Sequence, residues 1–301
     1  MKKRPFLVGF LVASAAAAIF YVVIVGTFAL LGKSGGFAQS VLKNEVDVGV
    51  VDVFDVIESS RKITEQIRDY VEDDSIRALL VRIDSPGGAV APTQEIYDEV
   101  RRAIKAGKPV VATLGSTAAS GAYYIAAGCS TIVADPGTLT GSIGVIMEIM
   151  DVEGAFDKLG LKSEVVKSGK YKDAGSPTRA LTADERRMLQ ATIDDVHSQF
   201  VAAVAEGRNL PPEAVESIAD GRIFSGQQAL ALGLVDQLGS FHDATDLLKE
   251  ELGVKGKINL IFPKKRKPDF LDYFFDRMSD SLREGLRGLS ARDDQRRLYF
   301  R

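Results

Sequence analysis

From Asp47 onward, short apolar runs of strand length alternate with stretches that repeat apolar residues at helical spacing. The runs are rich in Val, Ile and Leu, as expected for strands buried on both faces. The predicted strands are residues 48–54, 78–83, 109–114, 131–134, 144–150 and 164–167. The predicted helices between them are residues 63–71, 96–104 and 118–127, with Gly107 ending the second. Strands separated by helices pair in parallel, so the sequence predicts an α/β domain with a mostly parallel, helix-covered sheet.

One further helix is marked by its cap. Thr182 and Glu185 have the spacing of a capping box, in which each side chain accepts a hydrogen bond from the other residue's backbone N–H. An apolar stripe follows at helical spacing from Leu189 to Val204. Gly207 is typical of a helix end, so we expect the helix to stop there.

The first residues predict a membrane anchor. Lys2, Lys3 and Arg4 precede an uncharged apolar run over residues 6–31, which exceeds the 18 or so residues of a transmembrane candidate. A cleavable signal peptide is the alternative, but its apolar region spans only about 7–15 residues. The basic flank favours a single-pass anchor with a cytoplasmic N-terminus and the rest of the chain outside the cytoplasm.

The sequence therefore divides into four segments. Residues 1–32 are the basic flank and anchor, residues 33–45 a linker, residues 46–262 the α/β domain and residues 263–301 a C-terminal extension. The extension carries an apolar stripe from Phe270 to Leu286 and more basic than acidic residues. It could lie on an anionic membrane, pack on another subunit or remain loosely folded.

Two glycine-bearing loops each follow a predicted strand and precede a predicted helix. Such loops meet at the carboxyl edge of a parallel sheet, where α/β proteins gather ligands. One contains Gly87 and Gly88, whose backbone N–H groups could approach a developing oxyanion. The other places the hydroxyl of Ser120 before Gly121, whose N–H is a second possible donor. Taken alone, each loop is more often a turn or a tight packing site.

A serine nucleophile needs a base, and the two histidines are poor candidates. His197 lies inside the predicted long helix and His242 near a later helix start. A lysine can serve if burial favours its neutral form. Lys172 follows a predicted strand in a loop that could return to the sheet edge, although Lys167 and Lys170 are local rivals that spacing leaves open.

At these residues the chain resembles the signal peptide peptidase A family of bacterial Ser-Lys proteases, peptidase family S49, in its short form. The resemblance runs from about residue 46 to 254. It rests on four segments in order: Asp84-Ser-Pro-Gly-Gly88, residues 115–124 around Ser120, Thr140-Gly-Ser-Ile-Gly-Val145, and residues 168–177 around Lys172.

The resemblance implies a ClpP/crotonase-like spiral of ββα units. It implies Ser120 as nucleophile and Lys172 as general base, with Gly88 and Gly121 as oxyanion donors and Gly87 shaping the loop. Ser142 and Ser168 become candidates for orienting the lysine.

The resemblance further implies a serine endopeptidase of the bacterial inner membrane that cleaves hydrophobic peptides, above all remnant signal peptides. It implies a homo-oligomer whose active sites are completed between subunits. No metal or organic cofactor is implied.

Two other classes of protein account for fewer of these sequence features. A crotonase-like acyl-CoA enzyme would use the two glycines but not the serine and lysine segments or the anchor. A non-catalytic oligomeric membrane scaffold would need neither Ser120 nor Lys172. The formal net charge of −3 gives no reason to expect a nucleic-acid partner. Cys129, the single cysteine, stands in an apolar setting that predicts an inert buried thiol.

Overall fold

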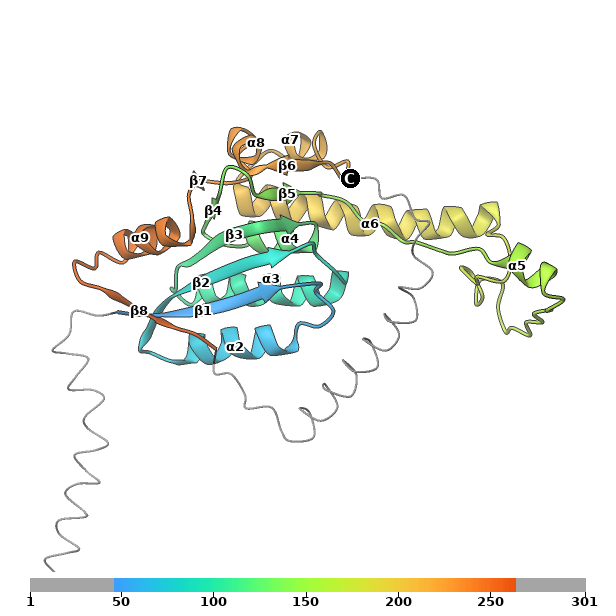
Figure 1. The fold of residues 1–301 in the computed structure, drawn as a ribbon, viewed down its shortest axis with the longest axis horizontal. Helices are drawn as coiled ribbons and strands as arrows, with labels where there is room; N and C mark the ends of the chain where they lie inside the picture. Colours follow the sequence, from blue (N-terminus) through green and yellow to red (C-terminus); the bar gives the residue numbers. More distant parts are fainter. Residues whose placement is uncertain (1–45, 264–301) are drawn as a thin grey trace, which may run out of the picture. The chain divides into compact units, whose positions relative to one another are not determined.

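The structure is a computed structural model that describes residues 46–263. Its centre is an eight-stranded sheet in which β6, β5, β3, β2, β1 and β8 follow one another, while β4 pairs with β3 and β7 with β4 (Figure 1). Only β5 and β6 pair antiparallel. The strands are β1 (Val46–Phe54), β2 (Ile76–Ser85), β3 (Val110–Ala119), β4 (Thr131–Ala134), β5 (Leu139–Gly141), β6 (Ile223–Ser225), β7 (Gln237–Leu238) and β8 (Ile258–Ile261). The predicted mixed α/β, mostly parallel sheet is confirmed.

Helices cover both faces of the three central strands. The helices are α2 (Arg61–Glu72), α3 (Val90–Lys105), α4 (Gly121–Ala127), α5 (Glu153–Lys158), α6 (Ala183–Arg208), α7 (Pro212–Glu216), α8 (Gly226–Ala231) and α9 (Phe241–Glu251). The larger core joins alternate residues of β1, β2 and β3 to α2, α3, α4 and α6. A smaller core on the other face packs Leu80 and Val111 against Leu248 of α9. Burial on both faces explains why these strands read as continuous apolar runs.

Helix α6 begins as its sequence predicts but ends differently. Thr182 and Glu185 form the capping box. The prediction that Gly207 ends the helix is wrong, since α6 runs to Arg208 and is capped by Asn209 in the left-handed conformation. Gly207 is instead a packing position, because a Cβ there would lie 1.9 Å from the carbonyl oxygen of Ala127. The missing side chain lets α6 approach the end of α4.

The boundary between β3 and α4 also differs from the prediction. The strand continues to Ala119 because residues 117–119 pair in parallel with β5. The helix starts at Gly121 rather than Ala118. Ser120 is thus the single residue between strand and helix.

The strands predicted at residues 144–150 and 164–167 are not formed. All of these residues except 144 and 145 belong to a segment, here called the arm (residues 146–181), that extends beyond the sheet towards the side where the β1–β3 arrowheads point (Figure 1). Among the described residues the arm contains one helix, α5, and no strand. Val166 is 96% exposed, so its apolar run has no sheet partner to bury it.

Several predictions lie outside the described residues. These are the membrane anchor, the linker as far as residue 45, and the extension from residue 264. Within residues 46–263 no helix has both the length and the hydrophobicity to cross a membrane.

Candidate functional site

Ser120 occupies a sharp turn from strand to helix. Its backbone has φ 54° and ψ −124°, a conformation that L-residues rarely adopt. Its N–H donates to the carbonyl of Gly141 at 2.9 Å, and its own carbonyl accepts from the N–H of Tyr124 at 2.9 Å. These bonds from a neighbouring strand and from α4 hold the strained turn. A serine on such a turn presents its hydroxyl at the end of the sheet, as nucleophilic serines on strand–helix elbows do.

The loop from Ser85 to Ala89 leaves one N–H group free. The Gly87 N–H donates to the Ser85 hydroxyl oxygen at 3.1 Å, and the Ala89 N–H donates to the Ile57 carbonyl at 2.8 Å. The Gly87 carbonyl accepts from the Ile57 N–H at 2.9 Å. The Gly88 N–H has no acceptor within residues 46–263. The clamp on Ile57 therefore fixes the loop while Gly88 keeps an unused donor.

This free donor lies beside the serine turn. A Cβ on Gly121 would lie 3.3 Å from the Gly88 nitrogen and 2.7 Å from the Thr93 hydroxyl oxygen. A Cβ on Gly87 would lie 2.8 Å from the Gly121 nitrogen. The Gly121 N–H opens α4 and likewise has no acceptor among the described groups. Two free N–H groups beside a strained serine form the arrangement that binds an oxyanion.

Ser120, Gly88 and Gly121 line a cavity of about 580 Å³. Its apolar wall includes Val90 of α3 and Tyr124 of α4. Helix α6 supplies the facing wall, with apolar and polar side chains together. These α6 residues are Gln190, Ile193, Asp194, Val196, His197 and Phe200.

The sequence prediction missed this role of α6. Its apolar stripe was noted without a role in a site, whereas Ile193 and Val196 are only partly buried and line the cavity. A usable signal was present, because Gln190, Asp194 and His197 repeat at i, i+4 and i+7 and so share one helix face.

Of the two serines proposed to orient the lysine, only Ser142 lies at this cavity. It has φ 51°, and its N–H donates to the Arg222 carbonyl at 2.9 Å. His197 Nε2 contacts the Ala219 carbonyl at 2.7 Å, which ties α6 to the loop before Arg222. Ser168 is exposed on the arm and does not line the cavity.

Lys172 does not line the cavity either. It lies on the arm, exposed, in a turn where its N–H donates to the Gly169 carbonyl at 3.2 Å. Within one chain the structure therefore brings together the serine and the glycines, but not the lysine.

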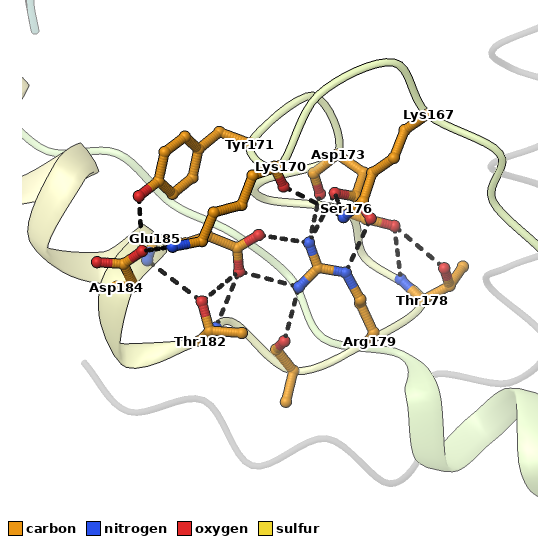
Figure 2. Close-up of polar contacts among 11 residues, drawn as sticks. Lys167, Lys170, Tyr171, Asp173, Ser176, Thr178, Arg179, Thr182, Asp184 and Glu185 are labelled. Carbon is orange, nitrogen blue, oxygen red and sulfur yellow. Dashed lines mark hydrogen bonds and ion pairs between the residues drawn. The ribbon is translucent and has the colours of Figure 1, made fainter.

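The three neighbouring lysines nonetheless differ in their partners, and Figure 2 shows the contacts of Lys167 and Lys170. Lys167 pairs with Asp173 at 2.5 Å, and Lys170 pairs with Asp184. The hydrogen bond to Asp184 raises the pKa of Lys170, which keeps that amine in its ammonium form and leaves less of the neutral form that a general base needs. The Lys172 amine has no hydrogen-bond or ion-pair partner within the described part of the chain. Of the three amines, that of Lys172 is therefore the one that remains available, within the described residues, to interact with a group from another molecule.

Within the described residues, the thiol is buried and the side chains that could bind a metal ion do not cluster. Cys129 is buried as predicted, and burial raises the pKa of its thiol to about 12, which disfavours the reactive thiolate form. In residues 46–263 no three His, Cys, Asp or Glu side chains cluster so as to hold a metal ion.

Comparison with known proteins identifies the relatives of this chain. The pattern of peptidase family S49 matches residues 102–255, and that of the Clp protease family matches residues 40–134. A putative protease of Synechocystis is 50% identical over 189 residues, which is 63% of this chain and 68% of that protein. A putative signal peptide peptidase SppA of Enterococcus faecium is 40% identical over 186 residues, 62% of this chain and 54% of the relative.

Protease 4 of Salmonella typhi is 38% identical over 218 residues, 72% of this chain. The match spans 35% of Protease 4, so the chain corresponds to about a third of that relative and about half of the Enterococcus one. The S49 pattern covers Ser120, Gly121 and Lys172, and the Clp protease pattern covers the Gly87–Gly88 loop. The chain belongs to peptidase family S49, the signal peptide peptidase A family.

Proposed function

We propose that this peptidase is a serine endopeptidase in which Ser120 is the nucleophile and Lys172 the general base. The observation that carries the proposal is the meeting of Ser120 with two unused N–H groups, those of Gly88 and Gly121, at one cavity. An enzyme for another reaction could use the two donors alone. A strained serine beside them adds a nucleophile, and the pair supports acyl transfer.

The proposed reaction has an acylation step and a hydrolysis step. The Ser120 hydroxyl oxygen attacks a peptide carbonyl carbon while the neutral Lys172 amine takes the hydroxyl proton. The N–H groups of Gly88 and Gly121 donate to the resulting oxyanion. The ammonium of Lys172 then protonates the leaving amine as the C–N bond breaks, and water, deprotonated by the same amine, hydrolyses the acyl-enzyme.

The lysine comes from a second copy of the chain in this proposal. Lys172 is exposed, unpaired within the described residues, and absent from the lining of its own cavity. The arm that carries it exposes several large apolar side chains, among them Ile146 at 91% and Val166 at 96%. Such a surface is typical of a subunit interface. Burial of the amine against a neighbour would favour its neutral form.

The substrates proposed are hydrophobic peptides, above all signal peptides left in the membrane after secretion. The cavity supports this class because Val90, Ile193 and Phe200 offer it apolar surface. The apolar run at residues 6–31 supports anchoring in the bacterial inner membrane, with the peptidase domain outside the cytoplasm. A membrane anchor would keep the cavity near such substrates.

The test is hydrolysis of a fluorogenic hydrophobic peptide by the full-length chain in detergent micelles. Ser120→Ala and Lys172→Ala should each abolish hydrolysis, whereas Lys170→Ala should retain most of it. Equal activity in all four proteins would rule out the dyad and favour a scaffold. Retention of an acyl-CoA on an inactive wild type would favour the crotonase-like alternative.

Mixed assembly tests where the lysine comes from. Ser120→Ala and Lys172→Ala subunits, unfolded together and refolded at equal amounts, should recover about a quarter of wild-type activity if each site draws on two subunits. That quarter is the fraction of sites that receive both an intact serine and an intact lysine. No recovery would place the dyad within one chain.

A further inference from the structure

Arg179 stands at the centre of an ionic cluster on the arm, about one helical turn before α6 (Figure 2). It contacts two carboxylates, Asp173 and Glu185, both largely shielded from solvent, with side chains 11% and 4% exposed. Asp173 is the residue directly after Lys172. Glu185 is the capping-box glutamate in the first turn of α6. The cluster therefore joins the lysine-bearing turn to the start of the longest helix among the described residues.

The guanidinium uses every donor that it has. Its Nε donates to Asp173 Oδ2 at 3.0 Å, and its Nη2 donates to the Asp173 carbonyl at 3.1 Å. Nη1 donates to Glu185 Oε2 at 2.9 Å, and Nη2 donates to Glu185 Oε1 at 2.5 Å. The remaining N–H, on Nη1, donates to the Ala180 carbonyl at 3.1 Å. An arginine carries five N–H donors, and all of them are satisfied here.

Such an arrangement is demanding and specific. Only a planar fork can bind one carboxylate with two nitrogens while a third nitrogen reaches a second carboxylate, and a lysine amine cannot reproduce it. The contacts fix both the side chain and the backbone carbonyl of Asp173. Because Asp173 follows Lys172 directly, these contacts restrain the backbone immediately after the lysine.

The neighbouring side chains reinforce the same turn. Lys167 donates to Asp173 Oδ1 and to the Lys170 carbonyl, while Tyr171 donates to Asp184 at 2.6 Å. Helix α6 then continues from this cluster to the residues that line the Ser120 cavity. Hydrogen bonds and ion pairs thus join this turn to α6 at several points. Among the three lysines, only Lys172 has a side chain without such a contact within the described residues. Such an arrangement holds the backbone that carries the proposed base and leaves the amine itself without a bond.

We propose that Arg179 is a positioning residue that holds the Lys172-bearing turn against the first turn of α6 and so sets the direction of the lysine amine. The inference rests on the proposed function, since it assigns Lys172 the role of base. Arg179 itself does not line the Ser120 cavity. Its removal should slow proton transfer and leave peptide binding in the cavity nearly unchanged.

The experiment compares Arg179→Gln and Arg179→Lys with wild type in the full-length chain. Arg61→Gln is the matched control, because Arg61 also pairs with a glutamate but lies exposed on α2, away from the arm. We expect kcat to fall about 10- to 100-fold in Arg179→Gln, the usual effect of misplacing a catalytic group by about 1 Å. KM should change by less than about threefold, and Arg61→Gln should match wild type.

A rescue experiment separates positioning from simple loss of structure. Guanidinium ion at low millimolar concentration should restore part of kcat to Arg179→Gly, whereas sodium at equal ionic strength should not. Arg179→Lys keeps the charge but not the fork, and should stay closer to Arg179→Gln than to wild type. Wild-type kcat in Arg179→Gln or in Arg179→Lys would overturn the proposal. If Arg179→Gln does not fold, Asp173→Asn takes its place, because it removes only the charge of the carboxylate that pairs with Arg179. The same fall in kcat is expected.

Hydrogen exchange keeps this result distinct from a failure of the proposed function. Peptides covering residues 168–176 should exchange faster in Arg179→Gln than in wild type or Arg61→Gln, whatever the activity. If Lys172→Ala is active, the assignment of the base falls even though the exchange result stands. If Lys172→Ala is inactive but the exchange of the turn is unchanged in Arg179→Gln, the positioning role falls and the base assignment stands.

Discussion

Gly87 offers the sharpest test of the candidate oxyanion site, through its replacement by alanine. It has φ +101°, a conformation that favours glycine. A Cβ at this position would lie 2.8 Å from the Gly121 nitrogen, 2.9 Å from the Ala119 carbonyl oxygen and 3.0 Å from the Ser120 Cβ. The substitution therefore pushes against the nucleophile turn and one of the two proposed oxyanion donors together.

Gly107→Ala separates this contact effect from backbone strain. Gly107 has φ +86°, and a Cβ there would meet nothing within 4 Å. Both substitutions carry a left-handed backbone penalty of about 1–2 kcal/mol. Only Gly87→Ala should also displace a donor, which typically costs about 3–4 kcal/mol of transition-state stabilisation, or about 10²- to 10³-fold in kcat.

The assay measures kcat on a fluorogenic hydrophobic peptide and the free energy of unfolding in urea for both variants. Gly107→Ala should lose about 1–2 kcal/mol of stability and keep wild-type kcat at a temperature where it is folded. Gly87→Ala should lose kcat in addition. Equal kcat in the two variants would refute the assignment of this loop to the oxyanion site.

Three further predictions concern groups outside this loop. Cys129, whose thiol pKa is raised to about 12 by burial, should resist Ellman's reagent in native protein and react rapidly in urea; rapid native labelling would contradict the buried setting. His197→Gln should retain at least about a third of wild-type kcat, because His197 ties α6 to the Ala219 carbonyl and we assign it no proton transfer; loss of about 10³-fold would favour a histidine base. Arg179 lowers the pKa of Glu185 to about 2, below its value in the unfolded chain, so this contribution to stability is present above about pH 4.5 and disappears as the pH falls towards 2. The urea midpoint should therefore fall more between pH 7 and about pH 3 in wild type than in Glu185→Gln, and equal falls would show that the pair is not formed.

Local signals in the sequence predicted the elements that local chemistry controls. The three central strands were found because burial on both faces requires continuous apolar runs. The start of α6 was found because the capping box involves only Thr182 and Glu185, three residues apart. The strand–helix junction was predicted between residues 114 and 118, whereas the structure places it at Ser120.

Elements that depend on distant partners were missed or misplaced. The β-branched run at residues 164–167 has strand propensity, yet Val166 is 96% exposed because no neighbouring strand offers hydrogen bonds there. Strands β6, β7 and β8 are two to four residues long and form only against β5, β4 and β1. Gly207 was interpreted as a helix end because its contact with Ala127 lies 80 positions away in the sequence.

The sequence by itself determined the α/β class, the family, and which serine, glycines and lysine to examine. The class follows from periodicity, and the serine and glycines from turn chemistry, which are local properties of the chain. The family, and the choice of Lys172 among three lysines, follow from the resemblance carried by the order of the short motifs. The tertiary structure alone decided that Gly88 keeps a free N–H beside Gly121, since that depends on the clamp formed by Ile57. It also decided that Lys172 lies on an exposed arm and outside the Ser120 cavity, because residues 146–181 form no strand that would hold them against the sheet.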